Sequence, residues 1–194
     1  MPRPSWSARP AALLRGLTLI ELMVGIAILV VLATLAAPSF LRQIHTARLS
    51  AASSDLMATL ARARGEAIRR GQRITVCRSQ DGSTCSTDAA QRWDTGWLVF
   101  QDTNANSALD TGEAVLSRTP AAGTQLLVRG NLAFQDRIFF RPSGEASGNG
   151  TLRVCSTASS LPDAERARDL VVIRTGRVVL TTPAAVSSAC EAKS

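Results

Sequence analysis

The sequence predicts an α+β protein, with a long N-terminal helix packed on a C-terminal antiparallel β-sheet head. The helix is expected to be transmembrane in its first half and amphipathic in its second. Three observations support this. Residues 22–37 contain no charged side chain. Apolar residues then recur at three- and four-residue steps from Phe40 to Ile68. Past Gln72, short apolar runs alternate with Gly, Asn, Asp and Ser, a pattern typical of strands and turns.

The span from Leu17 to Ala37 has the length of a membrane crossing. Its 21 residues would form a helix of about 31 Å, which matches a bilayer core of about 30 Å. Arginines precede the span and a largely polar domain follows it. The sequence therefore predicts a single-pass inner-membrane protein with a cytoplasmic N-terminus and a periplasmic head. The chain therefore divides into four segments. They are the basic N-terminal segment 1–16, the transmembrane span 17–37, the helical stalk 38–71 and the β-rich head 72–194.

Glu21 interrupts this apolar span. A carboxylate at that depth costs about 2.5–3.5 kcal/mol unless it is paired, so we interpret it as functional. A cut after Gly16 would place a new terminal amine on Leu17, four residues from Glu21. A carboxylate and an amine on neighbouring subunits would then neutralise each other and fix the axial stagger of a helical stack.

The run from Gly16 through LTLIELMV resembles the prepilin peptidase site of type IV pilins and type II secretion pseudopilins. The resemblance implies removal of the leader 1–16 by cleavage between Gly16 and Leu17, N-methylation of Leu17, and a role for Glu21 in filament assembly. The family usually has Phe at the first mature position, so Leu17 is a departure.

A conventional secretory signal is the alternative for this region. Small residues near Ala36 and Ala37 would suit its cleavage site and would give a soluble periplasmic protein. The apolar stretch is longer than the usual 7–15 residues of such signals, and Glu21 would have no purpose in it. These two features favour the prepilin interpretation.

The second half of the helix is expected to lay its apolar face on a sheet. Pro38 can kink or restart the helix, with Ser39 as a local cap. Gly71 is a suitable stop after Arg69 and Arg70, whose charge favours a helix C-terminus. One helix over residues 17–70 is therefore expected.

Eight short apolar runs in the head are predicted to be strands, and a hairpin at Thr175–Gly176 joins the last two. We expect Trp93 and Trp97 to fill the core. The predicted strands are Arg73–Arg78, Gly96–Gln101, Ala114–Arg118, Leu126–Val128, Arg137–Arg141, Thr151–Ser156, Asp169–Arg174 and Arg177–Thr181.

The runs RARGEAIRRGQRITVC and WDTGWLVFQDTNANSALDTGEAVL are similar to the GspH/FimT family of minor pseudopilins. The similarity covers about residues 17–118 and implies a type IV pilin-like fold. It also implies a structural subunit, not an enzyme, that helps initiate a filament at its tip in a type II secretion or type IV pilus system. The implied partners are other pilins or pseudopilins, the prepilin peptidase and an inner-membrane assembly platform.

The polar residues provide little for catalysis or for a zinc centre. The chain has one histidine, His45, and no GxSxG motif. Its one lysine is Lys193, so a P-loop is excluded. The four cysteines form no CxxC pair, and two disulfides suit an oxidising periplasm. Cys77–Cys85 and Cys155–Cys190 are favoured, although three pairings are open.

One loop has the oxygen spacing of a calcium site. Counted from Asp102, oxygen-bearing side chains stand at positions 1, 3, 5, 9 and 12, as in an EF-hand loop. Position six is Ser107 where such loops have glycine, and strands flank the loop. A loop held together by hydrogen bonds is the alternative, and otherwise no cofactor is expected. The candidate ligands are Asp102, Asn104, Asn106, Asp110 and Glu113.

The formal net charge of +7 raises the question of DNA. Removal of residues 1–16 would lower it to +4. Some members of the family in transformable bacteria bind DNA through a Gly-Arg-x-Arg stretch. Here Gly176 and Arg177 match its start, the second arginine is missing, and Arg174 across the turn could substitute. The alternative for Arg174 and Arg177 is two solvated arginines in a turn. The alternative for the high net charge is a codon composition that favours arginine.

Overall fold

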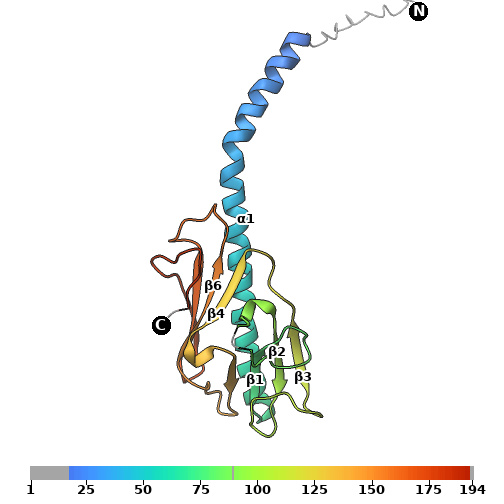
Figure 1. The fold of residues 1–194 in the computed structure, drawn as a ribbon, viewed down its shortest axis with the longest axis vertical. Helices are drawn as coiled ribbons and strands as arrows, with labels where there is room; N and C mark the ends of the chain where they lie inside the picture. Colours follow the sequence, from blue (N-terminus) through green and yellow to red (C-terminus); the bar gives the residue numbers. More distant parts are fainter. Residues whose placement is uncertain (1–17, 89, 193–194) are drawn as a thin grey trace, which may run out of the picture. The chain divides into compact units, whose positions relative to one another are not determined.

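The computed structural model describes residues 18–88 and 90–192. Its main elements are one long helix and eight strands (Figure 1). Contacts group the chain into two compact units, Met1–Ser39 and Phe40–Ser194. The first contains the apolar half of helix α1, and the second, which we call the globular unit, contains the rest of α1 and the strands.

Helix α1 extends from Leu19 to Arg70 as one element. It continues through Pro38 without a restart, in agreement with the expectation of one helix; leucines and alanines around the proline are good helix formers and favour continuation. The helix ends as expected at Gly71, whose φ of 61° suits a C-terminal glycine. The Gly71 N–H donates to the Ile68 carbonyl at 3.4 Å.

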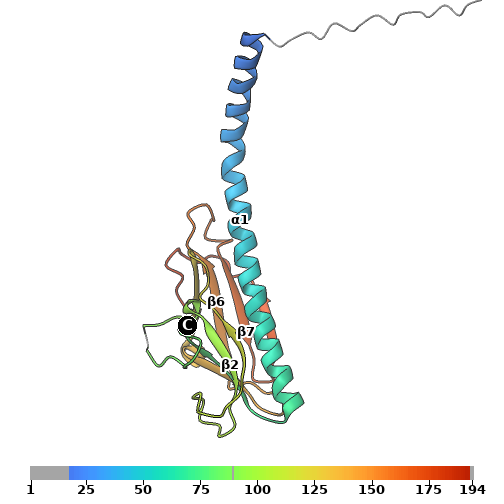
Figure 2. The same ribbon diagram turned by 90° about the vertical axis from the view of Figure 1, so that its right-hand side faces the viewer.

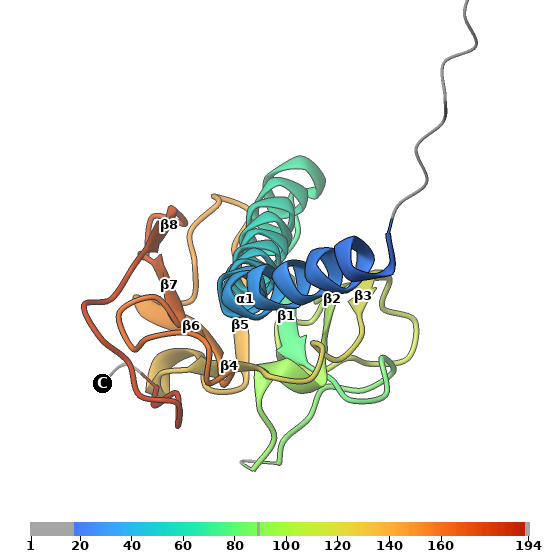
Figure 3. The same ribbon diagram turned by 90° about the horizontal axis from the view of Figure 1, so that it is seen from above.

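The strands form two four-stranded antiparallel sheets, which we call sheet A and sheet B. Figure 3 shows both lying along the second half of α1. Sheet A has the order β3-β2-β1-β5, and sheet B has the order β4-β6-β7-β8. Their bounds are β1 Ile74–Arg78, β2 Trp97–Gln101, β3 Val115–Thr119, β4 Leu126–Gly130, β5 Arg137–Phe140, β6 Gly150–Ser156, β7 Ala167–Val172 and β8 Val178–Thr181.

The chain crosses between the sheets in the middle of the globular unit. Strands β1 to β3 form one meander and β6 to β8 another. Between them β4 joins sheet B beside β6, and β5 returns to sheet A beside β1. Two short 3₁₀ helices, η1 at Trp93–Thr95 and η2 at Leu132–Phe134, lie in the connections.

The core forms where α1 meets both sheets. Leu49, Leu56 and Leu60 of α1 are fully buried and belong to one apolar cluster with Val76 of sheet A and Leu170 of sheet B. Burial of each such side chain contributes about 1.5–3 kcal/mol. Figure 2 shows this part of α1 running beside β2, β6 and β7. The second half of the helix is therefore part of the globular core.

The two tryptophans occupy the core, which confirms the prediction. Trp93 is fully buried and Trp97 is 5% exposed. Trp93 Nε1–H donates to the Phe134 carbonyl at 2.9 Å, so its one polar atom is satisfied. The same carbonyl oxygen would lie 1.9 Å from a Cβ placed at Gly130. This contact explains the glycine at the end of β4.

Candidate functional site: the apolar half of α1

The apolar half of α1 exposes large side chains on all sides. Leu19 is 77% exposed and Leu35 is 72% exposed, and the aliphatic residues between them are similarly open. By length and composition α1 is able to cross a membrane. A helix that is apolar all round needs an apolar environment, either a lipid bilayer or the matching helices of other chains.

Glu21 lies in the first turn of this helix. Its backbone N–H donates to Thr18 Oγ1 at 3.3 Å, and Thr18 O accepts from the Leu22 N–H at 3.1 Å. Thr18 is thus the N-cap, with Glu21 at the third helical position. This is the spacing of a capping box, in which the acid also favours the positive end of the helix dipole. Glu21 therefore has a local structural role beside its expected role in assembly.

Thr18 was not predicted to be functional, although the T-x-x-E spacing could have indicated the cap. The two other residues of the predicted processing site, Gly16 and Leu17, lie outside the described residues. Cleavage between them and methylation of Leu17 stay predictions.

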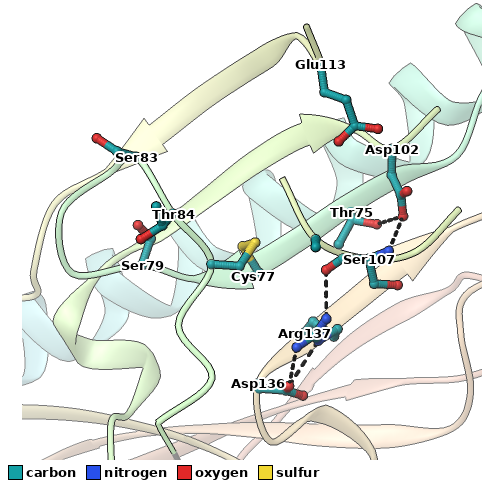
Figure 4. The surroundings of a disulfide bond; sticks show 12 residues. Thr75, Cys77, Ser79, Ser83, Thr84, Asp102, Ser107, Glu113, Asp136 and Arg137 are labelled. Atoms are coloured by element: carbon teal, nitrogen blue, oxygen red, sulfur yellow. Dashed lines mark hydrogen bonds and ion pairs between the residues drawn. A yellow bond between two sulfur atoms is a disulfide. The ribbon is translucent and has the colours of Figure 1, made fainter. Parts of the chain in front are cut away.

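The structure contains the two disulfides that the spacing favoured, Cys77–Cys85 and Cys155–Cys190. The first closes a short loop after β1 (Figure 4). Its Cys77 belongs to an apolar cluster with Leu98 and Phe100. The second attaches the C-terminal segment to β6. Both stabilise loops of the globular unit.

The loop after β2 is organised by its own hydrogen bonds. Asp102 is 1% exposed and turns into the globular unit, where Oδ2 accepts from Thr75 Oγ1 at 2.8 Å and from the Ser107 N–H at 3.1 Å (Figure 4). Arg73 Nε lies 3.0 Å from the same oxygen. Asp102 therefore serves as an anchor between β1 and the loop.

The other candidate calcium ligands also bond within the loop. The amide nitrogens of Asn104 and Asn106 donate to Asp110 at 2.8 and 2.7 Å, and these bonds lower the pKa of Asp110. Glu113 accepts from the Thr103 and Asp110 N–H groups at 2.7 and 3.1 Å. Among the described residues, no group of three or more His, Cys, Asp or Glu side chains could hold a metal ion. The loop's hydrogen bonds link Asn104, Asn106, Asp110 and Glu113, while Asp102 Oδ2 bonds to Thr75. Calcium binding by the five residues stays a prediction.

The two arginines considered for DNA flank the turn between β7 and β8. The turn is closed by the Gly176 N–H to the Ile173 carbonyl at 2.8 Å and the Ile173 N–H to the Arg177 carbonyl at 3.0 Å. Arg174 and Arg177 are both exposed. Within the described part of the chain, neither guanidinium has a carboxylate oxygen within 4 Å. The predicted hairpin is therefore present, with its two charges open to solvent.

Two family models match this sequence. The prokaryotic N-terminal methylation motif covers residues 15–37, the segment that contains the predicted cleavage site and Glu21. The type II transport protein GspH model covers residues 52–176, from the buried half of α1 to the β7–β8 turn. The chain belongs to the GspH family. It is a minor pilin or pseudopilin with an N-methylation motif, a structural subunit by its family.

One known relative and two solved structures are similar to this chain. The chain is 36% identical over 135 residues to the pilin-like protein PilA1 of Thermus thermophilus, covering 70% of this chain and 72% of PilA1. Two crystal forms of the type IV minor pilin FimU of Pseudomonas aeruginosa share the fold. One has a TM-score of 0.52 at 20% identity over 71% of this chain and 93% of FimU. The other has a TM-score of 0.50 at 21% identity over 70% and 98%.

Proposed function

We propose that this GspH-family chain enters the inner membrane with its N-terminus in the cytoplasm, loses residues 1–16 and joins a pilus-type filament. Other pilins, the prepilin peptidase and an inner-membrane platform are its partners, and it helps to initiate the filament at its tip. One observation supports this above the others. Glu21 is the only charged residue between Arg15 and Arg42, and it lies in the first turn of a helix whose apolar side chains are exposed.

The pairing of Glu21 explains why a carboxylate is kept there. Cleavage after Gly16 would create an amine one turn away along the helix. In a filament that amine on one subunit meets Glu21 of the next, and each charge removes the cost of the other in an apolar surrounding. The side chains from Leu22 to Leu35 then pack against the same segment of neighbouring subunits.

Mass analysis of the N-terminus of the chain isolated from cells tests the processing step. We expect a mature chain that begins with N-methyl-Leu17, and a Gly16→Leu variant that keeps residues 1–16. Gly25→Ala is the matched control, since a Cβ at Gly25 has no atom within 4 Å and the variant should be processed normally. A mature chain that begins near Ala37 would contradict the proposal and support a conventional signal.

The proposed role in initiation predicts how many copies of this subunit a filament contains. A tip subunit should be present in far fewer copies than the major subunit, and its deletion should lower the number of filaments rather than shorten each one. Quantitative immunoblots and electron microscopy of sheared filaments measure both. A stoichiometry near one to one with the major subunit would exclude this role.

DNA binding is a second candidate function, and the open pair Arg174 and Arg177 favours it. Two guanidiniums at a hairpin tip can contact neighbouring phosphates of a duplex. If they do so, the double variant R174A/R177A should lose gel-shift activity, and binding by the wild type should weaken steeply with salt. R62A, which removes an exposed arginine of α1, is the control. Unchanged binding by R174A/R177A would exclude this contact.

A further inference from the structure

A cavity of about 520 Å³ lies where the end of β1 approaches β4. Sheet A contributes Arg78, the last residue of β1, and sheet B contributes Arg129 of β4. Trp93 of η1 and Leu132 of η2 also line it. Since both strands belong to the globular unit, the cavity is a feature of that unit alone.

Two arginines of this cavity, Arg78 and Arg129, form no ion pair with a described residue. Arg78 is only 2% exposed, and its Nε has no hydrogen-bond partner among the described residues. Arg78 Nη1 donates to the Gln91 carbonyl. Arg129 likewise has a buried Nε without a partner in the described structure. A buried donor left unsatisfied is destabilising, and more so when it is charged.

The cavity is positively charged because the described part of its lining contains no carboxylate that would neutralise Arg78 and Arg129. Arg92, which also lines it, is neutralised by Asp94 through bonds of 2.9 and 3.1 Å. Arg78 and Arg129 have no carboxylate oxygen within 4 Å in the described chain, and no acidic residue is among the described residues of the lining. Burial lowers the pKa of Arg78, while Asp136 and Asp88 at longer range partly oppose this effect. An anion with oxygen acceptors would satisfy both of these donors.

We propose that this cavity, which we call the arginine pocket, receives an acidic side chain of a neighbouring filament subunit. Leu132 on its lining is 93% exposed, more than Leu19 at the start of α1. An exposed leucine beside desolvated arginines suits a protein partner that places an apolar residue next to a Glu or Asp. The pocket's volume of about 520 Å³ lies within the range of about 300–1,000 Å³ of small-molecule pockets, which leaves room for an acidic side chain.

A nucleic acid fits the arginine pocket less well. Binding of a duplex depends on many phosphate contacts along an open basic surface. Here only two arginines without a carboxylate partner line one cavity, beside an apolar residue. The inference rests on the proposed function, since only a filament supplies a neighbouring subunit.

Peptide binding to the full chain in detergent micelles tests the pocket. The probe is N-acetyl-Leu-Glu-amide, with N-acetyl-Leu-Gln-amide as its neutral match, and the readout is the NMR shift of the arginine Nε–H and Leu132 amide signals. We expect the Glu peptide to bind at least tenfold more tightly than the Gln peptide. R129Q should weaken it at least tenfold, and R62Q, which removes the charge of an exposed arginine outside the pocket, should leave it unchanged. An unchanged thermal midpoint for R129Q verifies its fold.

Three results would overturn the inference. They are equal binding of the two peptides, full binding by R129Q, and tighter binding at Arg129 of a short DNA duplex than of the Glu peptide. A filament assay then separates this inference from the proposed function. If the Glu peptide binds but R129Q enters filaments like the wild type, the partner assignment is wrong. If the wild type itself is absent from filaments, the proposed function fails while the peptide result stands.

Discussion

Gly176 joins the β7–β8 turn to another loop and to α1. Its φ is +79°, and a Cβ there would lie 2.0 Å from the Gly144 carbonyl oxygen and 2.6 Å from Arg64 Nε. Arg64 in turn donates to the carbonyls of Gly144 at 2.9 Å and Thr175 at 3.2 Å. One helix arginine thus holds both turns, and only glycine fits between them.

Replacement of this glycine should be costly for two separate reasons. Gly176→Ala combines backbone strain with a clash, whereas Gly71→Ala has the same sign of φ (+61°) and no atom within 4 Å of its Cβ. We expect G71A to lower the free energy of unfolding by about 1–2 kcal/mol, and G176A to lower it at least twice as much. Guanidinium titrations of the two variants measure this, and equal losses would show that packing at Gly176 adds nothing.

Asp81 stabilises the loop closed by Cys77–Cys85. Its Oδ1 accepts from the N–H groups of Ser83 and Thr84 at 2.8 and 2.9 Å, and its Oδ2 accepts from Thr84 Oγ1 at 2.9 Å. These bonds, led by the one from Ser83, hold the pKa of Asp81 far below its usual range. A depressed pKa means that this stabilisation exists above the unfolded pKa of about 3.9 and is lost as the pH falls toward the folded value.

The variant D81N should therefore show a difference that depends on pH. Its thermal midpoint should lie below that of the wild type at pH 7, and the gap should narrow as the pH falls from about 5 to about 2. Calorimetry at several pH values measures the gap. A gap that stays constant over this range would contradict the role assigned to the Asp81 carboxylate.

At the scale of elements, the strands were predictable where the sequence signal is local. Each of the eight apolar runs is a strand, and the predicted bounds differ from the observed ones by at most two residues. β7 ends at Val172 rather than Arg174, because the Arg174 N–H bonds to the side chain of Asn149 and its carbonyl accepts from the Ala146 N–H. Such partners are distant in sequence and leave no local signal.

The division into two sheets was not predictable for the same reason. It depends on β4 and β5 pairing with strands of opposite sheets. The arginine pocket depends on it too, since its lining combines Arg78 of sheet A with Arg129 of sheet B. In contrast, the functional role proposed for Glu21 was predictable from the sequence. A single carboxylate within an apolar run can be recognised without knowing its partner.

The two disulfides close loops of different length. Their sequence separations are 8 for Cys77–Cys85 and 35 for Cys155–Cys190. Loop entropy predicts losses of about 2.5 and about 4 kcal/mol on removal. The pair C155S/C190S should therefore destabilise the globular unit more than C77S/C85S in guanidinium titrations, and the opposite order would show that loop length does not dominate.

The loop from Asp102 to Glu113 should be stable without metal. Its amide nitrogens and backbone donors already occupy the carboxylates, so EGTA or added calcium is expected to leave the thermal midpoint unchanged. A rise of several degrees with 1 mM calcium, reversed by EGTA and absent in D110N, would instead establish the calcium site that the spacing first suggested.

At the scale of the whole molecule, the apolar half of α1 and the globular unit have different properties. The globular unit has a core of its own, built from the second half of α1 and both sheets. The apolar half of α1 exposes its side chains and contains one carboxylate. In a filament of the proposed kind, that carboxylate sets the register and the apolar surface supplies the cohesion.

Incorporation of a Glu21→Gln variant into filaments tests this account most directly. Glutamine keeps the capping-box spacing with Thr18 but removes the charge, and Asp55→Asn, which removes an exposed carboxylate from the other half of α1, is the control. Immunoblots of sheared filaments should show E21Q reduced at least tenfold and D55N unchanged, with equal amounts of all chains in the membrane. Incorporation of E21Q at the wild-type level would contradict the account.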